Sequence, residues 1–411
     1  MSIATEITRL QGAKADLKTA IEAKGVTVPS SAKIDEYDTY VSQIPSGGGD
    51  SELVVTLSGS NIDRNLLKSP IPSVSTMSKV VIGKKIYMFG YLDTNNQNVV
   101  CKYDYETNQF TTLSATFEDN YYLGGHTIGT IVNNTDIYLV GGLLSGGNAA
   151  SNKIYKFDTT NDTLTRIGLI DANTANPNLV IYNGYLYIIG GRTTTSSIQT
   201  SLYKYNLSDN TSSRIMGYSL NSFYSRAQYV VGSVVYLFGG RIGTGTSTSS
   251  VTNTAYKLDM STDVLSTLAN MPDYRAGSDS VVELYNNELY IFGGKNRNSG
   301  SDPYAALTIF KYNIANDSYS TLTPQTLVHI NPAHLTIGTK LYLVGGASAS
   351  NYPNNNISIF DFANQSSIIT HQSDLIKLGS LTAIYESNAI ILLSNLATST
   401  PYDLIQRVEI E

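Results

Sequence analysis

The sequence predicts an all-β fold, a seven-bladed β-propeller, on three observations. First, a hexapeptide of β-forming residues that ends in a glycine doublet recurs along the chain. Its clear copies are IYLVGG, LYIIGG, VYLFGG, LYIFGG and LYLVGG, which end at Gly142, Gly191, Gly240, Gly294 and Gly346, and weaker copies end at Tyr91 and Asn395. Second, successive copies lie about 50 residues apart, which is the period of a propeller blade. Third, 33 Gly and 30 Tyr in 411 residues suit short strands joined by many turns.

Each unit is expected to contain four strands, named a to d. In the second unit the pattern predicts them at 127–132, 137–140, 153–158 and 163–167, with a tight turn at Asn161-Asp162. Strand c repeats a triplet of Lys, a large apolar residue and Asp or Asn. Five residues after that apolar residue comes a type that mostly tolerates a turn: Asn108, Asp162, Asn210, Asp263, Asp317 or Gln365.

Residues that recur in every unit are assigned to the scaffold. The Lys side chains of strand c, such as Lys102, are expected to lay their stems along the sheet with the charge in water. Asp104, Asp158 and Asp259 begin turns and are expected to cap backbone. Cys101 takes the place that Tyr or Phe holds in four later units, which favours a packing role over a nucleophilic one.

The N-terminal residues 3–24 have the pattern of an amphipathic, coiled-coil-like helix. Ile3, Ile7, Leu10, Leu17 and Ile21 fall at heptad spacing, with Lys14 and Lys24 in the same series. Such a stripe needs a partner, so we expect it to form a homo-oligomer, a homotrimer by preference, or to pack on the next segment. A shorter helix is predicted at 34–44. The Gly-rich stretch 46–51 is expected to be a linker between a helical module, 1–45, and the propeller, 52–411.

The last unit ends at Glu411, directly after its predicted strand c. The β-rich run 52–57, which precedes the first unit, is expected to supply the missing strand d. Pairing the two ends of the propeller in this way removes its free sheet edges.

The repeating units resemble kelch repeats over about residues 52–411. The resemblance rests on the Gly doublet after strand b, the aromatic-Asp pair in strand c, and a large residue seven positions later. A Pro and an Arg that lead into strand a survive best in the stretch from Met271 to Arg275. The chain contains no Trp, which kelch repeats usually carry. The resemblance therefore implies the fold of a divergent member more firmly than a function.

The first part of the chain, about residues 5–44, resembles the N-terminal module of tail-fibre and other virion proteins of phages and prophages. This resemblance implies a fibre or decoration protein located on the virion. Residues 1–45 would attach to other virion proteins, and the propeller would bind a host cell-surface glycan or protein. Two alternatives remain open: a virion enzyme that degrades polysaccharide, and a bacterial kelch module that binds another protein.

Composition and motifs weigh against several other classes. A net charge of −6 argues against a nucleic-acid partner, and no apolar run reaches transmembrane length, so we expect no membrane insertion. The four His residues lack a close metal-ligand spacing, and we expect neither a metal nor a cofactor. No catalytic residue is assigned, although two carboxylates from different loops would leave no signature and a glycan depolymerase stays open. The candidate loop acids are Glu118, Asp119, Asp273, Asp302 and Asp403.

The binding face is predicted on the side of the b-to-c and d-to-a connections, which are the long ones. Arg192, Arg241 and Lys295 directly follow three Gly doublets, whereas other units have Leu or Ala there. These cations are expected to bind an anionic group such as a phosphate or a uronic acid. Nearby loops add further candidate ligand-binding residues: Arg297, Tyr121, Tyr122, Phe223, Tyr224, Tyr274, Tyr304 and Tyr352.

Overall fold

The chain divides into two compact units, residues 1–56 together with Glu411, and residues 57–410. A computed structural model describes residues 14–15, 17–18, 21–22, 28–33, 74–92, 97–107, 109–118, 128–145, 149–194, 200–215, 226–241, 251–296, 308–322, 332–346, 356–371, 381–386, 389–394 and 405–409. Strands β1 to β27 all belong to the second unit.

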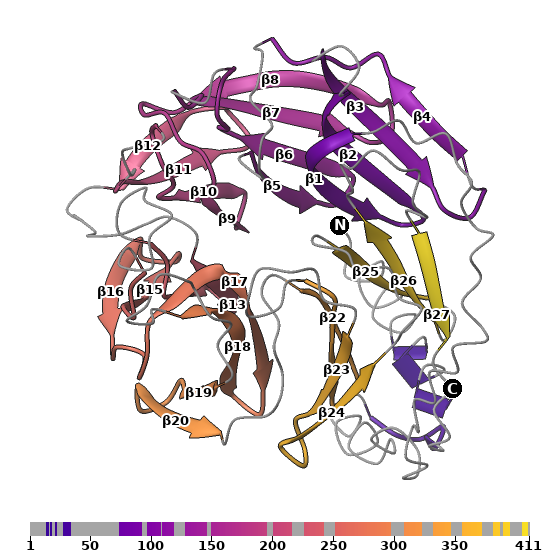
Figure 1. Cartoon of the computed structure of the whole chain (residues 1–411), viewed down its shortest axis with the longest axis vertical. Coiled ribbons are helices and arrows are strands. Elements are labelled where there is room, and N and C mark those ends of the chain that lie inside the picture. Colours follow the sequence, from indigo (N-terminus) through magenta and orange to yellow (C-terminus); the bar gives the residue numbers. More distant parts are fainter. Residues whose placement is uncertain are drawn as a thin grey trace. The chain divides into compact units, whose positions relative to one another are not determined.

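The second unit is an all-β propeller whose described residues form six four-stranded blades. Each blade is an antiparallel meander that pairs in chain order (Figure 1). Blade 1 is β1 (Val74–Ile82), β2 (Lys85–Leu92), β3 (Gln97–Asp104) and β4 (Gln109–Leu113); blade 2 is β5 (Gly129–Asn133), β6 (Asp136–Val140), β7 (Lys153–Asp158) and β8 (Thr163–Leu169); blade 3 is β9 (Asn178–Tyr182), β10 (Tyr185–Ile189), β11 (Leu202–Asn206) and β12 (Ser212–Ile215). Blade 4 is β13 (Ala227–Val231), β14 (Val234–Phe238), β15 (Ala255–Asp259) and β16 (Val264–Leu268); blade 5 is β17 (Arg275–Tyr285), β18 (Glu288–Asn296), β19 (Ile309–Asn313) and β20 (Ser318–Leu322); blade 6 is β21 (Ala333–Ile337), β22 (Lys340–Val344), β23 (Asn356–Asp361) and β24 (Ser366–His371).

The prediction of seven complete blades is therefore corrected to six. The seventh copy of the repeat forms a three-stranded sheet of β25 (Leu381–Glu386), β26 (Ala389–Ser394) and β27 (Ile405–Glu409). This copy has lost both glycines of the doublet, and the chain ends after its third strand. The closing strand predicted at 52–57 lies outside the described residues, as does the linker at 46–51.

The hexapeptide forms the second strand of each blade, and its uniform apolarity has a simple cause. In β10, Leu186 and Ile188 pack toward blade 2, whereas Tyr187 and Ile189 pack toward blade 4. Successive side chains of a strand point to opposite faces, and both faces of this strand are covered by neighbouring blades. Each of the four side chains is at most 1% exposed. Burial of one such side chain contributes roughly 1.5–3 kcal/mol, so the repeat is the core of the fold.

The turn residues between the third and fourth strands have the conformation that the sequence predicts. Asp162, Asn210, Asp263, Asp317 and Gln365 all have positive φ angles between 49° and 60°. Asp and Asn tolerate this left-handed region better than most residues. Asn108 lies outside the described residues.

The first glycine of the doublet is required by close backbone approach. Gly141 has a φ of 65°, and a Cβ at this position would lie 2.0 Å from the carbonyl oxygen of Thr174. Thr174 belongs to the connection into the next blade. The doublet thus marks the place where that connection crosses the end of the second strand.

The first unit is described at only a few positions and has no helix with defined bounds. Six described positions between 14 and 22 have helical backbone, but most of the predicted helices at 3–24 and 34–44 lies outside the described residues. Lys14 Nζ donates to the carbonyl of Ala32, and Ile21 is 2% exposed within the single chain. Part of the predicted oligomerisation stripe, Ile21, is therefore already buried without a second copy, while Leu17 remains 40% exposed. Ile3, Ile7 and Leu10 are not among the described residues.

Candidate functional site

The b-to-c and d-to-a connections meet between blades 4 and 5 in a small antiparallel strip, which we call strip 4/5. Its backbone pairs are Arg241 with Val251, Thr252 with Arg275, and Ala276 with Lys295. The Gly240 N–H donates to the Arg275 carbonyl (2.9 Å), and the Thr252 N–H donates to the Gly240 carbonyl (3.0 Å). The strip therefore fastens two blades together, and it places both kinds of connection on one side, as the sequence predicts.

The same backbone arrangement recurs between blades 2 and 3, and we call it strip 2/3. Its pairs are Leu143 with Ala150, Ser151 with Thr174, and Ala175 with Arg192. The Gly142 N–H donates to the Thr174 carbonyl (2.9 Å), as Gly240 does to Arg275 in the other strip. The two strips are thus one scaffold built twice, and their residues can be compared position by position.

A half-buried Asn supports each strip in the same way. The Asn152 side-chain amide donates to the Ile170 carbonyl (2.9 Å), and the Asn253 amide donates to the Met271 carbonyl (3.0 Å). The backbone N–H groups of Ile170 and Met271 donate back to the carbonyls of Asn152 and Asn253. This reciprocal bonding fixes the alignment of the two d-to-a connections.

Arg275 replaces Thr174 at the centre of strip 4/5. In strip 2/3 the Thr174 hydroxyl donates to the Gly190 carbonyl (2.7 Å). The Arg275 guanidinium donates to the equivalent Gly293 carbonyl (3.1 Å) and also to the Thr308 carbonyl (2.9 Å). Arg275 is 1% exposed, and burial lowers its pKa to about 10, against the opposing effect of Asp273. It therefore remains charged near neutral pH and ties the strip to blade 5.

Arg226 makes an equivalent set of contacts in blade 4. Its guanidinium donates to the Thr254 carbonyl (3.1 Å) and lies 4.8 Å from the Tyr256 ring centre, while that of Arg275 lies 4.6 Å from Phe310. Burial lowers the pKa of Arg226 to about 10. The sequence analysis did not assign a role to Arg226. The signal that could have found it is an Arg-Ala pair that recurs at Arg226 and Arg275.

Four of the aligned positions at which the two strips differ change the charge or the ring content, while both strips carry a cation at the aligned positions Arg192 and Lys295. The changes from strip 2/3 to strip 4/5 are Leu143 to Arg241, Ala172 to Asp273, Asn173 to Tyr274, and Thr174 to Arg275. Arg241 and Tyr274 are half-buried, and the Tyr274 N–H donates to the Asp273 carboxylate (2.7 Å). Strip 4/5 therefore carries charge and an aromatic ring where its twin carries mostly small or neutral residues.

The structure separates the predicted ligand-binding residues into three groups. Arg241, Tyr274 and the backbone of Lys295 come together in strip 4/5, whereas Arg192 lies in strip 2/3. The three cations therefore do not share one strip. The other predicted residues lie outside the described ones: Arg297, Tyr121, Tyr122, Phe223, Tyr224, Tyr304 and Tyr352.

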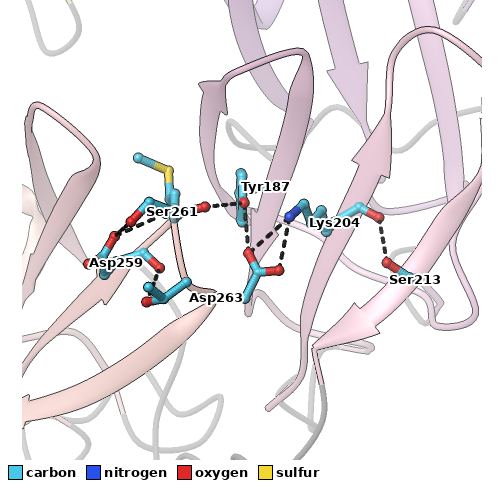
Figure 2. Close-up of polar contacts among 8 residues, drawn as sticks. Tyr187, Lys204, Ser213, Asp259, Ser261 and Asp263 are labelled. Atoms are coloured by element: carbon cyan, nitrogen blue, oxygen red, sulfur yellow. Dashed lines mark hydrogen bonds and ion pairs between the residues drawn. The ribbon is translucent and has the colours of Figure 1, made fainter.

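Four Lys residues of the third strands form ion pairs, which corrects the expectation of solvated charges for Lys102, Lys156, Lys204 and Lys311, whereas Lys257 is exposed as expected. Lys204 of blade 3 forms an ion pair with Asp263 of blade 4 (2.9 Å), and the Tyr187 hydroxyl donates to the same carboxylate (2.7 Å), as Figure 2 shows. Burial alone would lower the pKa of Lys204. The hydrogen bonds to Asp263 and Tyr187 outweigh this effect, so the pKa is raised above its ordinary value. Lys102 of blade 1 pairs in the same way with Asp162 of blade 2.

Scaffold roles are confirmed for the other recurrent polar residues and for Cys101. Asp158 accepts a hydrogen bond from the Thr160 N–H (2.8 Å), and Asp259 accepts one from the Ser261 N–H (2.9 Å), as expected of turn caps. Cys101 is fully buried, and burial raises its thiol pKa to about 11. A thiol with such a pKa is a poor nucleophile near neutral pH.

Two of the five candidate loop acids, Glu118 and Asp273, lie among the described residues. Glu118 forms ion pairs with Lys153 (3.2 Å) and Arg166 (3.1 Å), and Asp273 belongs to strip 4/5. Asp119, Asp302 and Asp403 lie outside the described residues. Within the described part of the chain, no group of three or more His, Cys, Asp and Glu is placed to hold a metal ion. No helix among the described residues is long and apolar enough to span a membrane.

Comparison with known proteins supports the propeller and its repeat. Residues 174–216 match the Kelch motif, from the d-to-a connection of strip 2/3 to the residue after β12. The solved structure of YjhT is similar at 15% sequence identity and a TM-score of 0.52, and the match covers 74% of this chain and 98% of that chain. No curated protein matches the chain. At this identity the likeness concerns the fold alone, so the chain is a propeller that contains a Kelch motif.

Proposed function

We propose that this chain is a phage or prophage virion component, a fibre or decoration protein, whose propeller binds a host-surface ligand. We expect that ligand to be a glycan. A propeller with a Kelch motif is an interaction or binding module, which agrees with this proposal and with the alternative of a protein ligand. The virion role rests on the resemblance of residues 5–44 to phage tail-fibre modules.

The observation that carries the binding function is strip 4/5. Its backbone repeats that of strip 2/3, yet Arg241 and Tyr274 replace Leu143 and Asn173. Residues that the scaffold does not need, on connections where variation is tolerated, are the first candidates for recognition.

The test is adsorption of the full chain to host cells or purified cell-wall glycan. The double variant Arg192→Ala/Arg241→Ala is expected to lose adsorption, and high salt is expected to mimic this loss in the parent. Unchanged adsorption by a variant that melts like the parent would refute a binding role for these cations. Release of soluble sugar from the glycan by the parent would instead support the polysaccharide-degrading alternative.

A further inference from the structure

Strip 2/3 is an internal control for strip 4/5. Both have the same backbone pairs and the same Asn support, so packing and hydrogen bonding alone do not require a different sequence. Leu143 shows that an apolar residue serves the scaffold at the position of Arg241, and Asn173 shows the same for a small amide at the position of Tyr274. The backbone arrangement of the strip therefore does not by itself require the Arg or the Tyr.

The buried Arg275 makes strip 4/5 the better anchored of the two. Its two hydrogen bonds, to the carbonyls of Gly293 and Thr308, replace the single bond of Thr174. Because it directly follows Tyr274 and pairs with Thr252, it fixes the backbone on which Tyr274 is carried. Preorganised groups bind with a smaller loss of conformational freedom. Arg275 is thus a positioning residue for the strip.

The chemistry of the strip selects a ligand class. An arginine guanidinium matches the paired oxygens of a carboxylate or phosphate, and a tyrosine ring offers an apolar face with a polar edge. Arg241 lies on the segment that bonds to both Thr252 and Arg275 through Gly240.

We propose that strip 4/5 is the specificity-determining binding site for an acidic oligosaccharide, with Arg241 on an acid group and Tyr274 against a sugar ring. The acid groups are carboxylates or phosphates. This inference rests on the proposed glycan-binding function and names its ligand class.

The test uses the full chain on an array of acidic bacterial polysaccharides, uronate-containing and phosphate-containing, each printed beside its carboxyl-reduced or dephosphorylated form. The parent is expected to bind an acidic form at least tenfold more tightly than its neutral form. The variant Arg241→Leu/Tyr274→Asn installs the residues of strip 2/3 on the same scaffold and is expected to lose at least tenfold in affinity. Whether the preference for the acidic form is seen with the uronate-containing or with the phosphate-containing polysaccharides identifies the acid group.

The matched control is Leu143→Ala/Asn173→Ala in strip 2/3, which is expected to bind like the parent. Melting curves of both variants check that the fold is intact. Equal binding of acidic and neutral forms, or an Arg241→Leu/Tyr274→Asn variant that binds like the parent, would overturn the site while leaving glycan binding in place. A parent that binds an acidic peptide and no polysaccharide would overturn both the site and the proposed function.

Discussion

Two kinds of blade interface differ in where the lysine of the third strand finds its acid. At the interfaces 1/2 and 3/4, Lys102 and Lys204 reach across to Asp162 and Asp263 of the next blade. In blades 2 and 5, Lys156 pairs with Asp136 (2.7 Å) and Lys311 with Glu288 (3.0 Å), both at the start of the neighbouring strand in the same blade.

In these four blades the difference matches the turn residue of the next blade. That residue is acidic at the first two interfaces but is Asn210 after blade 2 and Gln365 after blade 5. Where the turn residue is neutral, an acid appears at the first position of the second strand instead. A half-buried ammonium keeps a carboxylate partner in all four cases, and only the two cross-blade pairs can hold neighbouring blades together. In blade 4 Lys257 is exposed although the next turn residue is Asp317, which accepts from the Ala269 N–H and the Tyr312 hydroxyl.

The largest effect is expected from Asp263→Asn at the interface of blades 3 and 4. Asn keeps the positive φ of this turn but removes the charge that faces Lys204 and the strong acceptor of Tyr187. Loss of hydrogen bonds to a charged group is expected to cost about 2 kcal/mol. Thermal unfolding measured by calorimetry checks this, with Asp136→Asn as the matched change within one blade. An equal loss in the two variants would contradict a special role for the cross-blade pair.

A rescue experiment tests the compensation directly. Asp136→Ala removes the partner of Lys156 and is expected to cost about 0.5–1 kcal/mol, since both side chains are partly exposed. Adding Asn210→Asp creates the cross-blade geometry of the other interfaces and is expected to recover part of this loss. A double-mutant cycle measures the coupling. Additive effects of the two changes would show that turn and strand acids do not substitute for each other.

Tyr187→Phe is expected to destabilise more than Tyr87→Phe. The Tyr187 hydroxyl lies 2.7 Å from Asp263 and 2.8 Å from the Met260 carbonyl, whereas that of Tyr87 lies 3.5 Å from the Thr159 carbonyl. One such hydrogen bond contributes about 1 kcal/mol. Denaturant unfolding gives the free energy of unfolding of each variant. A larger loss of stability in Tyr87→Phe than in Tyr187→Phe would contradict the expected order.

The smallest effect concerns the turn caps, which both kinds of interface share. A hydrogen bond from Asn161 lowers the pKa of Asp158, and hydrogen bonds from Ser261 lower that of Asp259. Their contribution to stability is therefore present above the ordinary pKa of 3.8 and is lost as the pH falls through the lowered value. The variant Asp158→Asn/Asp259→Asn is expected to flatten the acid limb of melting temperature against pH. An unchanged acid limb would mean that other carboxylates control it.

Periodicity was enough to predict the propeller, because the hexapeptide is buried on both faces in every blade and tolerates little variation. In blade 2 the predicted strands agree with β5 to β8 within two residues at each end. The number of complete blades was wrong because it counted 52–57 as the fourth strand of the last unit, whereas the described residues of that unit form a three-stranded sheet and 52–57 lies outside them.

The candidate site could be predicted only in part. Arg241 was found because it breaks the repeat, but its separation from Arg192 depends on which connection each backbone pairs with, and sequence spacing does not contain that pairing. Arg226 and Arg275 were not assigned because a buried arginine that bonds to carbonyls has no sequence signature beyond its neighbours. The role of residues 3–24, the closure by 52–57 and the homotrimer stay predictions.

The paired strips also bear on how the protein would carry mechanical load. Under the proposed binding at strip 4/5, a pull on the held ligand would enter the protein at Arg241 and Tyr274. Because Gly240, Thr252 and Arg275 are joined by main-chain hydrogen bonds across the two blades, that force would be divided between blades 4 and 5. A tether of this kind resists detachment through the stiffness of two sheets, where a single protruding loop would yield on its own.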